Sequence, residues 1–271
     1  LKKAGYKITA IADKSPAALK RARSYIEGVL FCTPQKAVDK ADFILITTPD
    51  DTIFSACGEI ALCPLIKNKF VFHMSGAGDL DILDSAKKAG ASVGSIHPLQ
   101  SFSSIDQAIK NIPGSYFAIT SDDKAQALAK NIVRNLGGIP FLISSNQKPL
   151  YHAAACIASN YLVSLVNTVE SIYQAIGLNE KDAKKAYLPL VYGSLRNIEK
   201  SDSISSLTGP IARGDLGTIK KHISAISKNL PQYSSLYSSL GLITVKVAQK
   251  KGALNARQAK EINAILKGVK K

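Results

Sequence analysis

Histidine is the side chain best suited to proton transfer near neutral pH, and two of the four histidines in this chain lie at the ends of apolar runs. His73 closes the run 70–73, and His97 follows the run 91–96. Because ligands bind at the carboxyl ends of strands in open α/β sheets, both imidazoles are expected near one cleft. The alternative for each is an ordinary hydrogen-bonded loop residue. The pair predicts at least one histidine in a functional site, with His97 a candidate acid or base and a candidate substrate contact.

A second polar group lies on a long predicted helix. Tyr151 and His152 occur near its start, and Asn160 follows eight positions after His152. At 3.6 residues per turn, His152 and Asn160 are about 80° apart and share one broad face. Small residues line the rest of this face, which therefore meets either a ligand or a closely packed helix. His152 is a candidate acid or base, Asn160 a candidate for orienting a substrate, and Tyr151 a candidate substrate contact.

Arg213 is flanked by small residues in the segment 207–215, Leu-Thr-Gly-Pro-Ile-Ala-Arg-Gly-Asp. A guanidinium group in such a setting suits a carboxylate or a phosphate. Two alternatives stay open, since Arg213 can contact Asp215 internally and Gly214-Asp215 can simply begin the next helix.

Residues 13–15 carry two conflicting signals about a nucleotide. Asp13 follows the predicted strand 8–12, where an acidic residue accepts hydrogen bonds from an adenosine ribose. Lys14 and Ser15 come next and can instead hold a 2′-phosphate, although Ser15 also suits the N-cap of the following helix. We therefore expect NADP or NAD as cofactor without a choice between them.

Two later strand ends complete the predicted cofactor groove. Two groups of residues follow the carboxyl ends of these strands, where dinucleotides bind. Residues of these types are also typical of any turn from a strand to a helix. The residues concerned are Thr48, Pro49 and Asp50 after the run 43–46, and Ser75, Gly76 and Ala77 after His73.

Strand and helix patterns alternate through the first half of the chain. Strands are predicted at 8–12, 42–47, 70–73, 91–96, 116–120 and 139–143, and helices at 16–26, 50–62, 80–88 and 122–136. This order predicts a largely parallel sheet with helices on both faces. After residue 146 only helices are predicted, at 148–176, 180–198, 215–228, 232–250 and 256–269. We expect an α/β Rossmann-like domain at 1–145 and an all-helical domain at 146–271.

The opening residues 2–8 are typical of the end of a helix that leads into a strand. None of the 18 glycines forms the G-x-G-x-x-G turn that lets a backbone approach a pyrophosphate. We therefore expect the first strand of the dinucleotide-binding unit and its glycine-rich turn to lie outside this sequence. The alternative is an α/β fold that does not bind a dinucleotide.

Composition narrows the class of protein. The net charge is +15, but lysines spread along the chain supply most of it, and no basic block is interleaved with aromatic residues. Nucleic acid is therefore not the expected partner, whereas a positive field attracts anionic small molecules. No apolar window reaches membrane-spanning length and the N-terminus lacks a signal-peptide core, so we expect no membrane association and a cytoplasmic protein. Four cysteines without C-x-x-C spacing predict buried free thiols and no metal site.

Four blocks of residues resemble a known family, the Rossmann-like oxidoreductases that carry a C-terminal helical domain of unknown function. The family is related to 6-phosphogluconate dehydrogenase, pyrroline-5-carboxylate reductase and deazaflavin-dependent NADP reductase. The resemblance covers essentially the whole chain. It implies a Rossmann domain followed by a helical domain like that of 6-phosphogluconate dehydrogenase, a homodimer through the helices, and NADP or NAD as hydride carrier. The blocks are His73–Gly76, His97–Phe102, Tyr151–Ala154 with Ser159–Asn160, and Leu207–Pro210 with Ala212–Asp215 and His222.

These residues lead to the hypothesis of an NAD(P)-dependent oxidoreductase that acts on a small anionic substrate between the two domains, with Arg213 paired to its anionic group. A non-catalytic NAD(P)-binding module is the alternative, and it would leave the histidines dispensable. The block at His97 is also similar to one in prephenate dehydrogenases, where the histidine contacts the substrate. Asp13 departs from the basic residue expected for a firm NADP preference.

Overall fold

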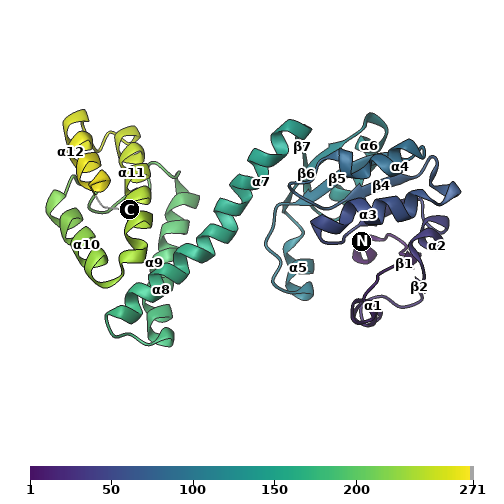
Figure 1. The fold of residues 1–271 in the computed structure, drawn as a ribbon, viewed down its shortest axis with the longest axis horizontal. Helices are drawn as coiled ribbons and strands as arrows, with labels where there is room; N and C mark the ends of the chain where they lie inside the picture. The colour runs from purple at the N-terminus through teal and green to yellow at the C-terminus, as the bar shows by residue number, and fades with distance from the viewer. Residues whose placement is uncertain (269–271) are drawn as a thin grey trace. The chain divides into compact units, whose positions relative to one another are not determined.

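The computed structural model describes residues 1–268 and divides into two compact units, Leu1–Asn160 and Tyr161–Lys271 (Figure 1). The division lies further along the chain than the boundary expected after residue 145. The reason is that the first turns of the long helical segment pack on the sheet, where Tyr151 meets Phe141 edge-to-face.

A five-stranded sheet forms the centre of the N-terminal unit, in the order β3-β4-β5-β6-β7. All neighbouring pairs are parallel except β5 and β6, which run antiparallel with Ser95 opposite Thr120. An antiparallel pair needs no crossover, so the connection through α5 (Ile105–Asn111) joins the end of β5 to the start of β6 at the same end of the sheet. The largely parallel sheet is confirmed. The strands are β3 (Phe43–Ile46), β4 (Phe70–His73), β5 (Ser92–Pro98), β6 (Tyr116–Ser121) and β7 (Ile139–Leu142).

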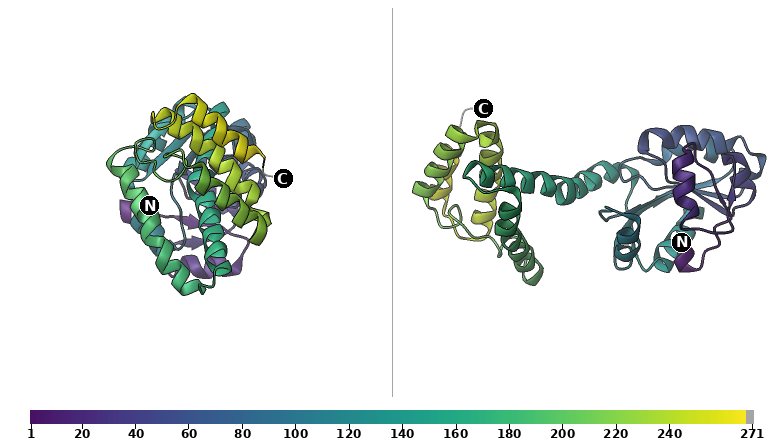
Figure 2. Two further views of the ribbon diagram at one scale, coloured as in Figure 1. Left: turned by 90° about the vertical axis from the view of Figure 1, so that its left-hand side faces the viewer. Right: turned by 90° about the horizontal axis from the view of Figure 1, so that it is seen from below.

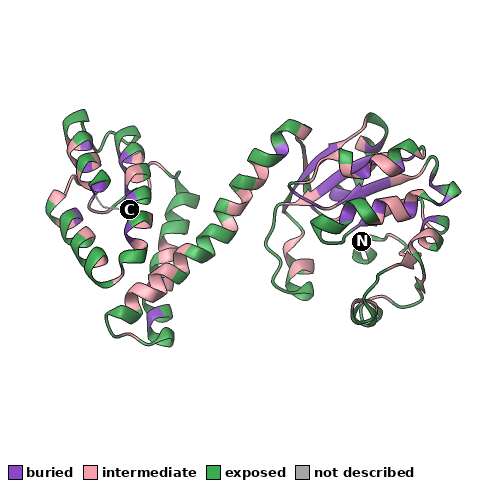
Figure 3. Cartoon of the chain, viewed as in Figure 1, coloured by how far each residue is buried: buried purple, intermediate pink, exposed green. Residues whose placement is uncertain are grey.

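Helices cover both faces of this sheet (Figure 2). Val71 and Phe72 of β4 are both fully buried, and they point into different cores because successive side chains alternate across a strand. One core packs against α3 (Asp50–Ala61), η3 (Leu80–Leu83) and α4 (Asp84–Lys88), and the other against α6 (Asp123–Asn135). Burial on both faces explains why the strands are nearly continuous apolar runs (Figure 3).

The first two strands stand apart from this sheet. β1 (Ala10–Ile11) and β2 (Leu30–Phe31) form a parallel pair of their own. Between them lies α1 (Pro16–Arg23). Its N-cap is Ser15, as the sequence predicts, and Ser15 Oγ accepts a hydrogen bond from the Ala18 amide at 3.3 Å. Three short elements, namely β2, α2 (Pro34–Asp39) and α5, were not predicted because they are too short to show a period.

The long helix predicted over 148–176 is not α-helical along its whole length. It consists of α7 (Lys148–Cys156), a π-helical segment over Ile157–Tyr161 and α8 (Leu162–Ala175). A π-helical segment bonds i to i+5 and is wider than an α-helix, so α-helical spacing does not carry across it. The angle of about 80° expected between His152 and Asn160 assumed α-helical spacing, so their placement on one broad face stays a prediction. His152 lies on α7 and Asn160 in the π-helical segment.

The C-terminal unit is helical in the residues that the structure describes. Its core is built by α10 (Leu216–Asn229), α11 (Ser234–Lys250) and α12 (Ala256–Lys267), with Ile219, Val245 and Ile262 fully buried. Helix α9 (Glu180–Lys200) packs on α8, where the Tyr187 hydroxyl donates to Glu170. The predicted helical domain is confirmed, although residue 269 of its last predicted helix is outside the described residues. Within residues 1–268, none of the helices has the length and hydropathy needed to cross a membrane.

Candidate functional site

The ends of β4 and β5 bring polar side chains together on one face of the sheet. His73 is paired in register with Ser95, and His97 lies two residues further along the same strand. Residues two apart on a strand share a face, so Ser95 and His97 both face the side that α7 approaches. We call the resulting group the strand-end cluster, and it consists of Asp50, Ser75, Ser95, His97, Lys148, Tyr151 and His152.

Ser75 organises the turn after β4. Its Oγ donates to Asp50 Oδ2 at 2.6 Å and accepts from the amides of Gly78 at 2.8 Å and Ala77 at 3.3 Å. The turn 75–78 is thereby tied to the first residue of α3. Three of the predicted groove residues, Asp50, Ser75 and Ala77, thus lie in one hydrogen-bonded network.

Lys148, at the start of α7, is the residue that sequence reasoning missed. Its side chain is 1% exposed, and Nζ donates to Ser95 Oγ at 2.8 Å and to the Ser75 carbonyl at 3.3 Å. None of the ion pairs formed within residues 1–268 includes it. Burial lowers the pKa of Lys148 from 10.5 to about 8, against a smaller opposing effect of nearby carboxylates. A signal existed, because a basic residue in the first turn of a helix opposes the helix dipole.

His97 and His152 converge at this edge. The two ring centroids are 5.9 Å apart, and His97 Nδ1 lies 2.7 Å from the Tyr151 hydroxyl. Burial, followed by the charges of His152 and Lys148, lowers the pKa of His97 to about 4. His97 is therefore a neutral imidazole at pH 7.

Gly76 is the residue that permits this convergence. A Cβ at this position would lie 2.6 Å from His152 Cδ2 and 2.7 Å from His97 Nε2. Contacts this short do not occur in folded proteins, so any other residue displaces at least one ring. The predicted groove residue Gly76 thus touches both candidate acid–base residues.

His73, by contrast, belongs to the interior. Its side chain is fully buried, Nδ1 accepts a hydrogen bond from the Ser75 amide at 3.1 Å, and Nε2 has no partner within residues 1–268. Burial, then the charge of Lys148, lowers its pKa to about 4. His73 supports the turn that carries Ser75 and does not join the half-exposed pair.

The other predicted nucleotide contacts lie exposed after β1 and β3. Asp13 Oδ1 accepts from the Ser15 amide at 2.7 Å, and Lys14 Nζ lies 2.6 Å from Glu59 of α3. Thr48 and Pro49 precede α3, whose N-cap residue, Pro49, makes no side-chain capping bond.

Two of the predicted catalytic and substrate-binding residues lie outside the strand-end cluster. Asn160 is exposed within the π-helical segment, and Arg213 is exposed in the C-terminal unit. No ion pair of residues 1–268 joins Arg213 to Asp215. Instead Asp215 caps α10 through the Thr218 amide at 2.9 Å, so the Gly214-Asp215 pair does begin this helix.

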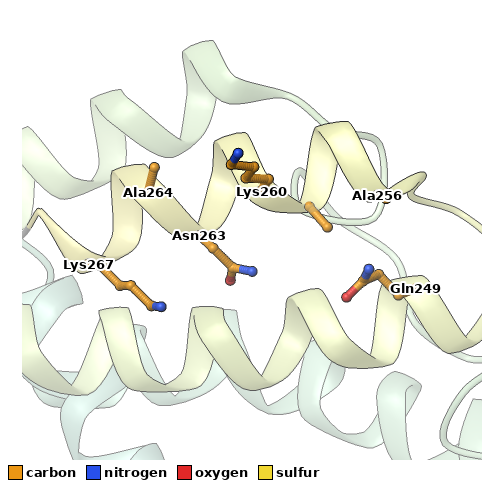
Figure 4. Close-up of a pocket in the computed structure, with 7 residues that line it drawn as sticks. Gln249, Ala256, Lys260, Asn263, Ala264 and Lys267 are labelled. Atoms are coloured by element: carbon orange, nitrogen blue, oxygen red, sulfur yellow. The ribbon is translucent and has the colours of Figure 1, made fainter.

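The remaining candidate features carry no predicted site residue. The described residues hold no group of three or more His, Cys, Asp or Glu arranged to bind a metal. Of the four free cysteines, Cys57 and Cys63 are buried as predicted, whereas Cys32 and Cys156 are only half-buried. A surface hollow of about 430 Å³ between α11 and α12 is lined by Gln249, Ala256, Ala259, Lys260, Asn263, Ala264 and Lys267 (Figure 4).

Comparisons with known protein families match both units of the chain. A family described as a Rossmann-like domain matches residues 1–98, and a domain of unknown function, DUF2520, matches residues 115–244. The chain joins a Rossmann-like domain to a DUF2520 domain. The DUF2520 match begins before β6, so it includes the last two strands of the sheet as well as α7. No curated protein matches the chain in sequence.

Solved structures share this architecture over most of their length. A protein from Thermotoga maritima is 26% identical with a TM-score of 0.72, covering 89% of this chain and 91% of its own. A Bacteroides fragilis protein, whose suggested activity is that of an NADP oxidoreductase, is 16% identical with a TM-score of 0.70 over 91% and 90%. Plasmodium falciparum pyrroline carboxylate reductase with NADP bound is 13% identical with a TM-score of 0.56 over 97% and 91%. The Rossmann-like domain and the DUF2520 domain are thus distantly similar in fold to NADP-dependent oxidoreductases.

Proposed function

We propose that the chain is an NAD(P)-dependent oxidoreductase that transfers a hydride between a nicotinamide cofactor and a small anionic substrate. The observation that carries this proposal is the convergence of His97 and His152 at the carboxyl edge of a Rossmann-like sheet. A non-catalytic binding module has no need of two imidazoles held together around a glycine. The nicotinamide supplies the hydride when bound, and the protein supplies orientation and electrostatics.

The cofactor in this proposal lies along three strand ends. Asp13, Lys14 and Ser15 take its ribose or 2′-phosphate, Thr48, Pro49 and Asp50 line the groove at the start of α3, and Ser75, Gly76 and Ala77 form its wall after β4. The fit is supported by the exposure of residues 13–15 and 47–50 and by the absence of a side chain at Gly76. Because Asp50 and Asp51 are acidic, the start of α3 suits hydroxyl groups better than phosphate.

We assign the chemistry on the substrate to residues other than those of the cofactor groove. We assign proton transfer to His152 or His97, orientation of the substrate to Asn160, and substrate contact to His97 and Tyr151. Arg213 is proposed as the partner of an anionic group, since a guanidinium binds a carboxylate or phosphate in a planar, two-bond geometry. Lys148 joins them as the buried cation that holds Ser75 and Ser95 in place.

We also propose that a further strand and a glycine-rich turn complete the sheet between β1 and β3. Within residues 1–268, β1 pairs only with β2, and β3 pairs only with β4, so each leaves one edge unpaired. Unpaired strand edges are unfavourable inside a domain because their amide and carbonyl groups lack partners.

Assembly and location complete the proposal. A homodimer through the helical domain is supported by α8 and α9, which expose large apolar side chains, including Val163 and Leu190 at 68% and 69%. Four free thiols agree with a reducing compartment such as the cytoplasm.

The test is direct binding of NADPH and NADH by calorimetry, on this chain and on a form extended at its N-terminus by a strand and a glycine-rich turn. Binding by the extended form, with NADPH and NADH differing in affinity, supports the oxidoreductase and identifies the cofactor. If the extended form folds and binds neither nucleotide, the oxidoreductase proposal is wrong.

A further inference from the structure

We propose that Tyr151 is a positioning residue that fixes the tautomer of His97, so that His97 meets the substrate as a neutral hydrogen-bond donor through Nε2. The meaning of this role in catalysis rests on the proposed function. The contact between Tyr151 and His97 is independent of the proposed function, because both side chains lie in the N-terminal unit.

The Tyr151 hydroxyl is held in place from two sides. It lies 2.7 Å from His97 Nδ1, and the two rings are nearly perpendicular, at 85° with their centroids 5.6 Å apart. The same tyrosine ring packs edge-to-face on Phe141 of β7 at 5.8 Å. One turn earlier on α7, Lys148 anchors the helix to the ends of β4 and β5. The hydroxyl therefore has little freedom to leave Nδ1.

The chemistry of the pair selects one arrangement of protons. A neutral imidazole carries one N–H and one lone pair, and a phenol O–H is a better donor than its oxygen is an acceptor. Burial raises the pKa of Tyr151 to about 12, so the phenol keeps its proton. Tyr151 then donates to Nδ1, and the imidazole proton must reside on Nε2.

Nε2 is the nitrogen left available. The hydrogen bond that the His97 side chain forms within residues 1–268 uses Nδ1, and Nε2 lies beside the backbone of Gly76, in a side chain that is half-buried overall. Burial, followed by the charges of His152 and Lys148, lowers the pKa of His97 and so opposes a second proton on the ring. His97 thus polarises a carbonyl or imine by donating from Nε2, as a neutral imidazole does where it acts as an electrophile. Proton transfer falls to His152.

The experiment is a two-dimensional ¹⁵N–¹H spectrum of the full chain at pH 7 with ¹⁵N-labelled histidine, without cofactor or substrate. Only four histidines contribute, and single His→Gln variants assign them. We expect the signals of His97 to show an unprotonated Nδ1 and a protonated Nε2. In Tyr151→Phe, which keeps the ring that packs on Phe141, we expect loss of this single tautomer.

A matched control exists in the other unit, where the Tyr237 hydroxyl lies 2.9 Å from His222 Nδ1. Tyr237→Phe should change the signals of His222 and leave those of His97 unaltered. A proton on Nδ1 of His97, a doubly protonated ring, or a Tyr151→Phe spectrum identical to that of the wild type would each overturn the proposal. Nucleotide binding is measured separately, so a negative result there would remove the oxidoreductase while leaving the tautomer result intact.

Discussion

The protonation states of the residues at the strand ends depend on one another. Burial is the largest cause of the lowered pKa values of His73, His97 and Lys148, and Lys148 lowers those of both histidines further. At pH 7 both imidazoles are neutral, and the lysine, with a pKa of about 8, is mostly charged. Lys148 is thus a buried cation close to two uncharged rings, that of His97 in the strand-end cluster and that of His73 in the interior. In the proposed function, this positive charge favours a substrate that gains negative charge.

Replacement of His152 tests its proposed role as acid or base. His152→Ala should lower kcat for NADPH oxidation by about 100-fold or more, the usual effect of losing a general acid or base, with little change in the Kd of NADPH. The substrate is the best of a panel of small anionic carbonyl and imine compounds. His222→Ala, at an exposed position of the C-terminal unit, is the control and should keep full activity. Equal turnover in the two variants would remove His152 from the mechanism.

His73 should make stability depend on acidity. Its folded pKa of about 4 lies below the ordinary 6.5, so the unfolded chain binds more protons between these values and stability falls as the pH drops through that window. At pH 5 the loss from His73 is about 2 kcal/mol relative to pH 7. Urea denaturation followed by circular dichroism should show a smaller loss in His73→Gln. An unchanged loss in His73→Gln would contradict the assignment.

At the scale of elements, the turn 75–78 connects β4, α3 and α7. Ser75 bonds to Asp50 on one side, its carbonyl accepts from Lys148 on the other, and Gly76 packs against two imidazoles. The first turn of α7 is thereby joined to the Rossmann-like sheet. This explains why the compact N-terminal unit includes α7.

Gly76→Ala should disturb the arrangement of His97 and His152 around the turn 75–78. The added methyl group displaces His97 or His152, so we expect a loss of turnover of at least about 10-fold, in the range seen when catalytic groups are misplaced. Gly58→Ala in α3 is the control, because a Cβ there meets no atom within 4 Å. It should keep its activity and gain up to about 1 kcal/mol in free energy of unfolding, the helix preference of alanine over glycine. Full turnover in Gly76→Ala would contradict the proposed geometry.

At the scale of the molecule, the two units differ in how well they bury apolar side chains. The sheet of the N-terminal unit is covered on both faces, whereas α8 has no buried residue along its 14 residues. Contiguous exposed apolar side chains in a folded protein mark an interaction surface. A second copy of the chain is the proposed partner of α8 and α9.

Light scattering after size-exclusion chromatography tests this assembly. We expect a dimer for the wild type and a monomer for the double variant Val163→Lys, Leu190→Lys, because two charges cannot be buried without partners. Leu62→Lys, at a position of the N-terminal unit that is 76% exposed, should remain dimeric. A monomeric wild type, or a double variant that stays dimeric, would exclude a dimer through these helices.

Local patterns predict most of the elements because their causes are local. Apolar runs buried on both faces determine the strands at 43–46 and 70–73, and Ser15 before Pro16 determines the start of α1. The position of His97 and of Ser75–Ala77 at strand ends also follows from the order of strands and helices. The π-helical segment over 157–161 has no signal in the local sequence, so the change of helical spacing between His152 and Asn160 could not be predicted.

The sequence by itself determined the α/β domain, the helical domain after it, and the histidine candidates, because hydrophobic period and capping act over a few residues. Only the tertiary structure decided which of them meet. Lys148 reaches Ser95 across 53 residues of chain, and Tyr151 reaches His97 across 54. Both contacts depend on strand register and on the path of α7, and the burial that lowers the pKa of Lys148 comes from that packing and not from the residue itself.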